Sequence, residues 1–233
     1  MSSLGLLVKY GGDAQGPIPE VFGWAEDGGQ GFIYMFLIHG GTVEERWRDF
    51  SEDERLAVCS ELRSMTTAWR ALTQDQQDCY VGNYDRKPLT EVFFWSEPKY
   101  QGPFYGVNSI QQLQEACRIE TNPEAPITFT HNDLVPPNIL LTPGPNPKVA
   151  AIIDWAQSGW YPSYWEYCKA RYVNVLWGDT LEDTGDGEFL QSRAIGDKAL
   201  QNEWWTKYLP LFLDPVDEEG VRHPWLYFAL GHV

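Results

Sequence analysis

Two carboxylates and a carboxamide lie close together in the second half of this sequence of 233 residues. Asp133 and Asn138 are five positions apart on a loop that contains Pro136 and Pro137, and Asp154 follows the apolar run at residues 149–153. A second short apolar run occupies residues 139–141. If the two runs pair as neighbouring antiparallel strands, the three polar side chains converge at one end of the hairpin.

This set of side chains suits phosphoryl transfer from a nucleotide. One carboxylate must accept or orient the attacking hydroxyl, and hard oxygen ligands must hold Mg²⁺ on the phosphates. We assign the first role to Asp133 and the metal to Asn138 and Asp154. We expect His131 to brace the loop by hydrogen bonding rather than to titrate. A lone His-x-Asp pair is more often a turn, so the interpretation depends on the whole set.

Three local patterns predict the elements that position these residues. Apolar and aromatic segments at residues 20–24 and 32–37 flank the turn signal Asp27-Gly28-Gly29, which predicts a hairpin. Ser51 and Glu54 form a capping box that starts a helix. Its apolar positions follow at helical spacing: Leu56, Cys59, Leu62, Met65, Trp69 and Leu72.

The rest of the chain gives weaker signals. Residues 78–108 are rich in Gly, Pro and aromatic side chains, so we expect ordered loops there with no long element. A second helix is predicted from Ser109 toward Arg118, and the helical pattern returns after Ser163 with an acidic break at residues 178–187. That acidic stretch is either a solvated loop or a feature that attracts a cationic substrate. Three C-terminal tryptophans are either core residues or lining of a substrate pocket: Trp204, Trp205 and Trp225.

Composition limits the classes of partner. The chain has 17 Lys and Arg against 33 Asp and Glu, a formal net charge of −16. This balance argues against nucleic acid and against anionic membrane surfaces as partners. The hydrophobic content of 43% and aromatic content of 15% predict a globular chain with a sizeable core.

The cellular setting is predicted from the cysteines and the apolar runs. The four cysteines are far apart with no CxxC pair, so we expect free thiols in a reducing compartment. The longest apolar run, residues 32–38, is far short of the roughly 20 residues that span a bilayer. We therefore expect a soluble cytoplasmic protein.

At the loop that carries Asp133, the sequence resembles the kinase-like aminoglycoside and choline phosphotransferase family. The family's catalytic loop reads H-x-D-x-x-x-x-N, matched here by residues 131–138, and its metal-binding Asp follows an apolar strand, matched by Asp154. Residues 80–82 and the segment 159–167 also look similar, most of all to the fungal branch of small-molecule phosphotransferase-like proteins. The resemblance covers residues 19–173.

The resemblance implies a fold, cofactors and further site residues. It implies an α+β, protein-kinase-like fold that binds ATP and Mg²⁺, with residues 1–40 as a reduced N-terminal nucleotide-binding lobe and hinge, and residues 41–233 as a mainly helical C-terminal lobe. Residues 34–40 resemble the strand and hinge that contact adenine, which makes Met35, Phe36 and Leu37 nucleotide-binding candidates. Lys9 is the candidate for the strand lysine that holds the phosphates.

The sequence departs from the family at two places. The segment before Lys9 is too short for two strands and a glycine-rich loop, and residues 12–17 leave no room for the helix whose glutamate pairs with the lysine. The catalytic loop has Asn132 where relatives usually have Gly, a change that Asn tolerates better than most residues.

Two functional hypotheses therefore remain open. The first is an ATP- and Mg²⁺-dependent kinase that phosphorylates a hydroxyl of an aminoglycoside-, choline- or sugar-like small molecule. If the negative charge of the chain attracts the acceptor, the acceptor is cationic. The second is a catalytically weak or inactive kinase-like binding module, either a pseudoenzyme or a truncated form. The sequence names neither the acceptor nor the oligomeric state.

Overall fold

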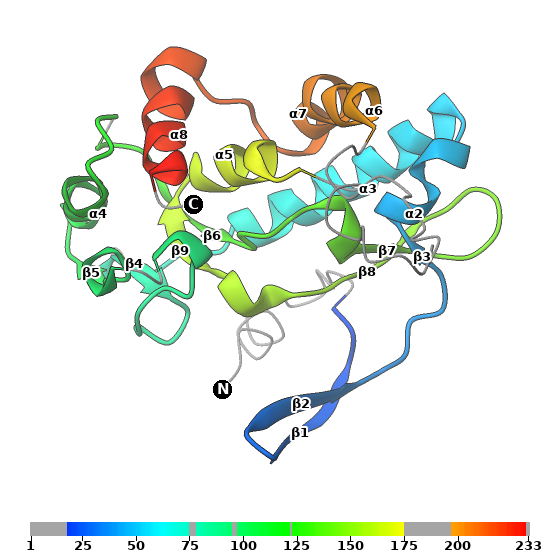
Figure 1. Cartoon of the computed structure of the whole chain (residues 1–233), viewed down its shortest axis with the longest axis horizontal. Coiled ribbons are helices and arrows are strands. Elements are labelled where there is room, and N and C mark those ends of the chain that lie inside the picture. The colour runs from blue at the N-terminus through cyan, green and yellow to red at the C-terminus, as the bar shows by residue number, and fades with distance from the viewer. Residues whose placement is uncertain (1–17, 75–77, 95–96, 122, 175–196, 232–233) are drawn as a thin grey trace, which may run out of the picture.

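A computed structural model describes residues 18–74, 78–94, 97–121, 123–174 and 197–231 of the chain. These residues form three small antiparallel sheets and a set of helices, with one hairpin that extends away from the remaining elements (Figure 1). Lys9 and the acidic stretch at residues 178–187 lie outside the described residues. No helix in the described part of the chain is long and apolar enough to cross a membrane.

The extended hairpin consists of β1 (Val21–Asp27) and β2 (Gln30–Met35), as the turn signal predicts. Gly28 and Gly29 have φ angles of +57° and +81°, and positive φ at both turn positions is what a tight two-residue hairpin requires. All six residues of β2 are exposed. The hairpin therefore has no described neighbour that buries either of its faces.

The sheet β3-β7-β8 lies at the end of the predicted catalytic loop. Its strands are β3 (Gly41–Thr42), β7 (Ile139–Leu141) and β8 (Val149–Ile152), with Ile139 opposite Ile152 in antiparallel register. The predicted second hairpin is thus confirmed. A Cβ at Gly40 would lie 1.8 Å from the Leu141 carbonyl oxygen, so only glycine allows this close approach beside β3.

A second sheet has the order β5-β4-β9-β6. It contains β4 (Tyr80–Asn83), β5 (Phe104–Tyr105), β6 (Ile127–Thr130) and β9 (Gly159–Pro162). The described parts of this region, residues 78–94 and 97–108, contain no long element, as expected, but they supply two of these short strands. Thr130 pairs with Gly159 at the end of β6, directly before the catalytic loop.

Helices cover the sheets β3-β7-β8 and β5-β4-β9-β6 on one side (Figure 1). They are α2 (Val43–Arg46), α3 (Glu52–Arg70), α4 (Ser109–Cys117), α5 (Trp165–Tyr172), α6 (Lys198–Glu203), α7 (Leu209–Phe212) and α8 (His223–Leu230), with π-helical turns at Trp204–Tyr208 and Glu218–Arg222. The predicted starts of α3 and α4 and the helix after Ser163 are confirmed.

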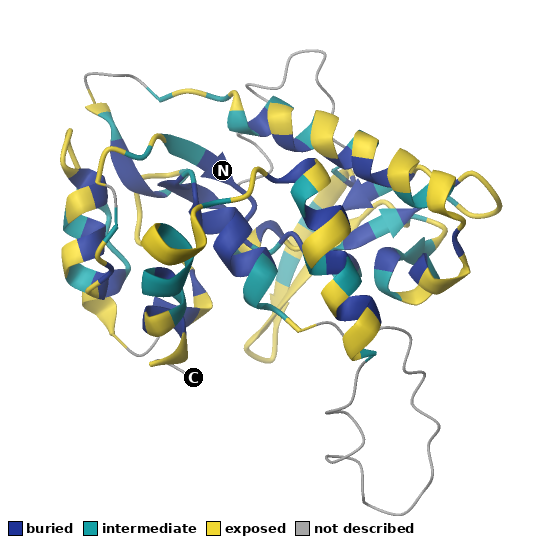
Figure 2. Cartoon of the chain, turned by 90° about the horizontal axis from the view of Figure 1, so that it is seen from above, coloured by how far each residue is buried: buried dark blue, intermediate teal, exposed yellow. Residues whose placement is uncertain are grey.

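The longest helix, α3, begins at the predicted capping box. The Ser51 side chain accepts from the Glu54 N–H, and the Glu54 carboxylate accepts from the Ser51 N–H at 2.9 Å. One stripe of the helix is buried and the opposite stripe is exposed (Figure 2). Two apolar positions of the predicted stripe differ: Leu56 is 41% exposed, and Leu72 lies beyond the last helical residue.

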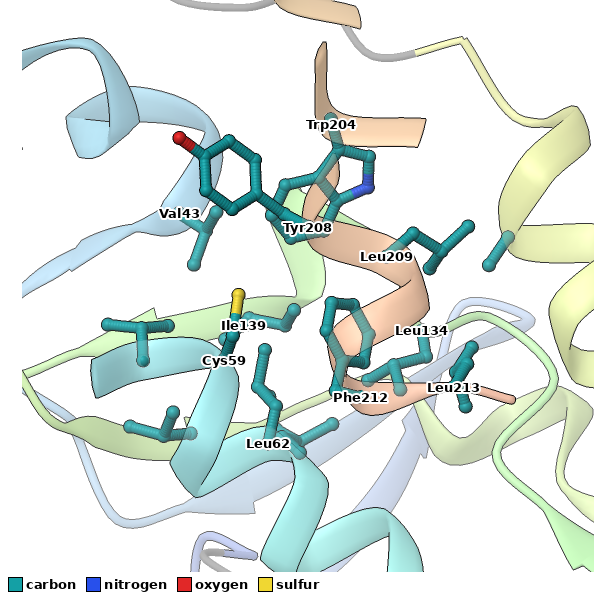
Figure 3. Packing of buried hydrophobic residues seen from close by; sticks show 14 of the residues in the cluster. Val43, Cys59, Leu62, Leu134, Ile139, Trp204, Tyr208, Leu209, Phe212 and Leu213 are labelled. Atoms are coloured by element: carbon teal, nitrogen blue, oxygen red, sulfur yellow. The ribbon is translucent and has the colours of Figure 1, made fainter. Parts of the chain in front are cut away.

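The core has two clusters of buried side chains. The first joins α3, the β7–β8 hairpin, α6 and α7, and Figure 3 shows Leu62, Ile139 and Phe212 within it. The second joins α4, α5 and α8. Trp204 and Trp225 are fully buried in the first and the second cluster respectively, which makes both of them core residues.

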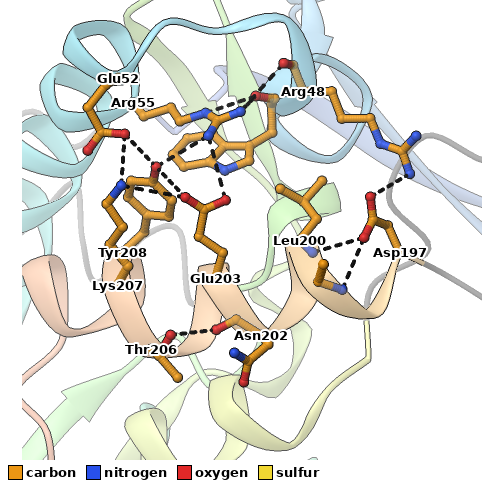
Figure 4. Close-up of polar contacts among 12 residues, drawn as sticks. Arg48, Glu52, Arg55, Asp197, Leu200, Asn202, Glu203, Thr206, Lys207 and Tyr208 are labelled. Carbon is orange, nitrogen blue, oxygen red and sulfur yellow. Dashed lines mark hydrogen bonds and ion pairs between the residues drawn. The ribbon is translucent and has the colours of Figure 1, made fainter.

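Polar contacts attach the segment after residue 197 to the start of α3 (Figure 4). The Tyr208 hydroxyl donates to Glu52 Oε2 at 2.8 Å, and Lys207 Nζ lies 3.0 Å from the same oxygen. Arg55 Nη1 donates to the Tyr208 hydroxyl at 3.3 Å. Because the Lys207 and Glu52 side chains are 47% and 46% exposed, their ion pair contributes little, and the apolar packing beneath it contributes most of the stabilisation.

Candidate active site

The loop between β6 and β7 brings Asp133 and Asn138 into contact. A 3₁₀ turn at Pro136–Asn138 ends the loop and directs Asn138 back toward its start. Asn138 Nδ2 donates to the Asp133 carbonyl oxygen and to Asp133 Oδ2, each at 2.9 Å. Among the described residues none donates to Asp133 Oδ1, so this oxygen can accept from a bound molecule. Burial raises the pKa of Asp133, and the nearby negative charge of Asp154 acts in the same direction.

Asp154 reaches the same region from the neighbouring strand. It follows β8 with φ of 60° and ψ of 61°, a left-handed conformation that Asp adopts more readily than most residues. The Ile153 N–H donates to the Asn138 carbonyl oxygen at 3.0 Å, which joins the two segments. Asp154 is exposed, whereas Asp133 and Asn138 are half-buried.

His131 is a buried hydrogen-bonding group of the loop. Its Nδ1 accepts from the Asp133 N–H at 3.1 Å, so Nε2 carries the proton and donates to the Ile153 carbonyl oxygen at 3.0 Å. Its ring packs edge to face on Trp155, with centroids 4.3 Å apart. Burial lowers the pKa of His131 to about 3. The imidazole is therefore neutral near pH 7 and connects the Asp133 loop to the segment that carries Asp154.

Asn132 has a φ of +67°, in the left-handed region where glycine is favoured and Asn is the usual alternative. Glu166, at the start of α5, accepts the N–H groups of His131 and Asn132 at 3.0 and 2.7 Å. Burial raises the pKa of Glu166 to about 7, although these hydrogen bonds favour its charged form. The carboxyl group of Glu166 therefore holds the backbone that precedes Asp133.

The residues that sequence reasoning missed lie beneath the loop. Glu91, Gln157 and Lys169 form a buried polar cluster in contact with Asn132. Glu91 and Lys169 are 78 positions apart in sequence, and neither lies in a recognisable motif. The sequence offers only a weak signal for this ion pair: Lys169 lies in the aromatic-rich segment 164–172, which also contains Glu166 and Arg171.

The predicted nucleotide contacts lie apart from this buried cluster. Met35 ends β2, and the Phe36 N–H donates to the Glu20 carbonyl oxygen at 2.8 Å. The side chains of Met35, Phe36 and Leu37 are 44%, 54% and 70% exposed. These three side chains are therefore available to a ligand, and they do not belong to the buried polar cluster beneath the catalytic loop.

The oxygen donors fit Mg²⁺ in number and type. Because Asn138 Nδ2 is engaged with Asp133, the atom that Asn138 offers a metal is its Oδ1, and Asp154 offers an exposed carboxylate. In the described part of the chain, no group of three or more His, Cys, Asp and Glu side chains could hold a metal ion. This pair of oxygen ligands suits Mg²⁺ on a nucleotide, because Mg²⁺ usually keeps waters and substrate phosphates as its other ligands.

The sheets, the helical layer and the loop with its carboxylate and carboxamide place the chain in the class of phosphotransferases with a protein-kinase-like fold. The family model described as "Phosphotransferase enzyme family" (APH) matches residues 6–205. The chain belongs to this family. No curated protein sequence matches it.

One solved structure with a TM-score above 0.5 has the same fold, and two others are similar at lower scores. The crystal structure of an aminoglycoside-3′-phosphotransferase of type VIII aligns over 98% of this chain and 79% of its own length, at 16% identity and a TM-score of 0.51. A putative aminoglycoside phosphotransferase from Ralstonia eutropha JMP134 aligns over 96% and 67%, at 17% identity and a TM-score of 0.45. The streptomycin–ATP–APH(2″)-IIa complex aligns over 71% and 57%, at 14% identity and a TM-score of 0.44. At these identities the likeness concerns the fold alone.

Proposed function

We propose that this protein transfers the γ-phosphate of ATP to a hydroxyl group of a small molecule, with Mg²⁺ as the metal. The observation that carries the proposal is the double hydrogen bond from Asn138 to Asp133, on a loop tied to the Asp154 segment by the Ile153–Asn138 hydrogen bond. These contacts support the roles proposed for the two carboxylates: Asp133 orients a hydroxyl and Asp154 binds a cation.

Each side chain has a distinct role in this proposal. Asp133 Oδ2 is held by Asn138, so Oδ1 accepts the hydrogen of the acceptor hydroxyl and aims its oxygen at the phosphorus. Asn138 Oδ1 and the Asp154 carboxylate would hold Mg²⁺. Bound with ATP, Mg²⁺ would neutralise the charge that develops on the transferring phosphate. His131 stays neutral and keeps the Asp133 N–H and the Ile153 carbonyl in place.

The nucleotide side of the site is proposed to lie on residues 1–40, as part of a nucleotide-binding lobe, with residues 41–233 as the catalytic lobe. Met35, Phe36 and Leu37 would contact the adenine, and Lys9 the phosphates. The exposure of the three hinge side chains supports this role, since an adenine ring would cover apolar surface that is otherwise in water.

The acceptor is proposed to be an aminoglycoside-, choline- or sugar-like alcohol. The net charge of −16 favours a cationic one and disfavours nucleic acid as a partner. We also propose a cytoplasmic location, supported by the four free cysteines.

One observation favours the alternative of a weak or inactive binding module. Both faces of the β1–β2 hairpin carry exposed apolar side chains, for example the neighbouring residues Ile33 at 61% and Tyr34 at 58%, which point to opposite faces. A nucleotide-binding lobe that leaves so much apolar surface in water would position ATP less firmly, and kinase chemistry depends on that positioning.

Phosphate transfer from radiolabelled ATP decides between the two functions. The purified chain is incubated with Mg²⁺, γ-labelled ATP and, separately, a deoxystreptamine aminoglycoside, choline and a hexose. A labelled product that Asp133→Asn abolishes and the exposed control Asp53→Asn retains would support the kinase. Labelled product that survives Asp133→Asn would contradict the assigned role, and no product with any acceptor would favour the binding module.

A further inference from the structure

The side chain of Asn132 points into a buried ion pair. Its Nδ2 donates to Glu91 Oε2 at 2.6 Å, to the Tyr161 hydroxyl at 3.0 Å and to the Gln157 carbonyl oxygen at 3.3 Å. All three partners offer oxygens, so the amide nitrogen must face them. The reversed amide would place its oxygen against the Glu91 carboxylate. The orientation of Asn132 is therefore set by Glu91.

Glu91 is in turn fixed by its own partners. Lys169 Nζ lies 2.6 Å from Glu91 Oε1, and the two side chains are 3% and 0% exposed. The Trp165 indole N–H donates to Oε2 at 3.2 Å, and the Phe93 N–H donates to Oε1 at 3.3 Å. Buried charges persist only when they are paired and hydrogen-bonded, so this carboxylate has little freedom to move.

Two carboxyl groups thus hold Asn132 from different sides. Glu166 accepts its backbone N–H at 2.7 Å, and Glu91 accepts its side-chain N–H at 2.6 Å. The next residue is Asp133, whose N–H donates to His131 at 3.1 Å. Glycine could adopt the same φ of +67° but has no side chain with which to reach Glu91.

We propose that Asn132, Glu91 and Lys169 form a positioning unit that holds the backbone of Asp133 in place. The ion pair acts through the Asn132 amide, which makes Glu91 and Lys169 positioning residues rather than catalytic ones. Their importance for turnover rests on the function proposed above, whereas their hold on the Asp133 backbone does not. The two can therefore be tested separately.

The sharpest test exchanges the two ends of the Asn132–Glu91 hydrogen bond. Asn132→Asp alone sets two carboxylates against each other. Combined with Glu91→Gln, it restores one hydrogen bond with donor and acceptor exchanged, and the new amide still offers a carbonyl oxygen to Lys169. The exchanged pair loses the Trp165 indole bond to Oε2 and the bond to the Gln157 carbonyl, so the restoration is partial. The readout is hydrogen exchange of the Asp133 N–H in the full chain. The control is Thr66→Val, which removes a buried 2.8 Å hydrogen bond to Phe212 away from the loop.

We expect exchange of the Asp133 N–H to speed up about tenfold or more in Asn132→Asp, and to return in part in the exchanged pair. Thr66→Val should lower the melting temperature and leave that exchange rate unchanged. If Asn132→Asp fails to fold, Asn132→Gly removes the same hydrogen bond, can adopt the same φ of +67°, and must also speed exchange. No recovery in the exchanged pair, or equal acceleration in Thr66→Val, would overturn the proposal.

Turnover gives the second readout. In the absence of an acceptor, hydrolysis of Mg²⁺·ATP should fall about tenfold in Asn132→Gly with an unchanged half-saturating concentration, because positioning affects the chemical step rather than binding. A raised half-saturating concentration with unchanged turnover would contradict the positioning role. If the unmodified chain neither binds nor hydrolyses Mg²⁺·ATP, the proposed function fails, and the exchange measurements still decide whether the ion pair holds Asp133.

Discussion

Glu166 should make the free energy of unfolding depend on pH, and the substitution Glu166→Gln should remove this dependence. Its carboxyl group is 1% exposed, and burial raises its pKa from 4.5 to about 7. One pKa unit corresponds to about 1.4 kcal/mol, so this difference corresponds to about 3 kcal/mol. Because the folded-state pKa lies above the unfolded one, the contribution to stability is complete below pH 4.5 and is lost as the pH rises through 7.

His131 acts in the opposite direction, so the total curve does not isolate Glu166. Its pKa in the folded state, about 3, lies below the ordinary 6.5, and its contribution to stability is present above pH 6.5 and lost as the pH falls. The difference in free energy of unfolding between the unmodified chain and Glu166→Gln cancels the contribution of His131, because both proteins contain His131. The Gln side chain imitates the protonated carboxyl group in size and charge.

The assay is urea unfolding followed by tryptophan fluorescence at several pH values. The free energy of unfolding of the unmodified chain, minus that of Glu166→Gln, should fall by about 3 kcal/mol between pH 4.5 and pH 7.5. Parallel curves would refute the reasoning. So would a difference that grows with pH, since it would mean that the hydrogen bonds from His131 and Asn132 outweigh burial.

Three further substitutions or measurements test other parts of the structure. Ser51→Ala should lower the free energy of unfolding by about 1 kcal/mol in urea, because it removes the side-chain cap of α3; an unchanged value would contradict the cap. Trp204→Ala should cost about 3–5 kcal/mol, because Trp204 is 1% exposed, while Trp205→Ala, at a half-buried site, should cost less. In ¹⁵N NMR, His131 should remain neutral down to about pH 4 with its proton on Nε2, and protonation near pH 6.5 would contradict its burial.

Local signals explain the parts of the fold that could be predicted. The turn at Gly28-Gly29 and the capping box at Ser51 depend on residues within a few positions of one another, and both were confirmed. The β7–β8 hairpin follows from two apolar runs around a Pro- and Gly-containing turn. That hairpin and the loop before it were enough to predict which segments carry the candidate site.

Long-range contacts explain what could not be predicted. The sheet β5-β4-β9-β6 joins short strands from distant parts of the chain, such as Gly82 opposite Trp160, and no local pattern shows such pairing. The cluster of Glu91 and Lys169 was missed for the same reason, because burial of a charge depends on the partner that folding brings to it. Leu56 has the spacing of a core residue but lies at the exposed edge of α3.

The central claim is that Asp154 and Asn138 hold Mg²⁺ with ATP beside Asp133. It is tested most directly by the melting temperature of the chain with millimolar ATP, with and without Mg²⁺. A ligand that binds only the folded state at 100 times its Kd stabilises it by about 2.7 kcal/mol, so the melting temperature should rise by several degrees. Asp154→Asn should abolish the Mg²⁺-dependent part of this rise, and Asp133→Asn should retain it. No rise in the unmodified chain, or the reverse pattern in the two variants, would contradict the claim.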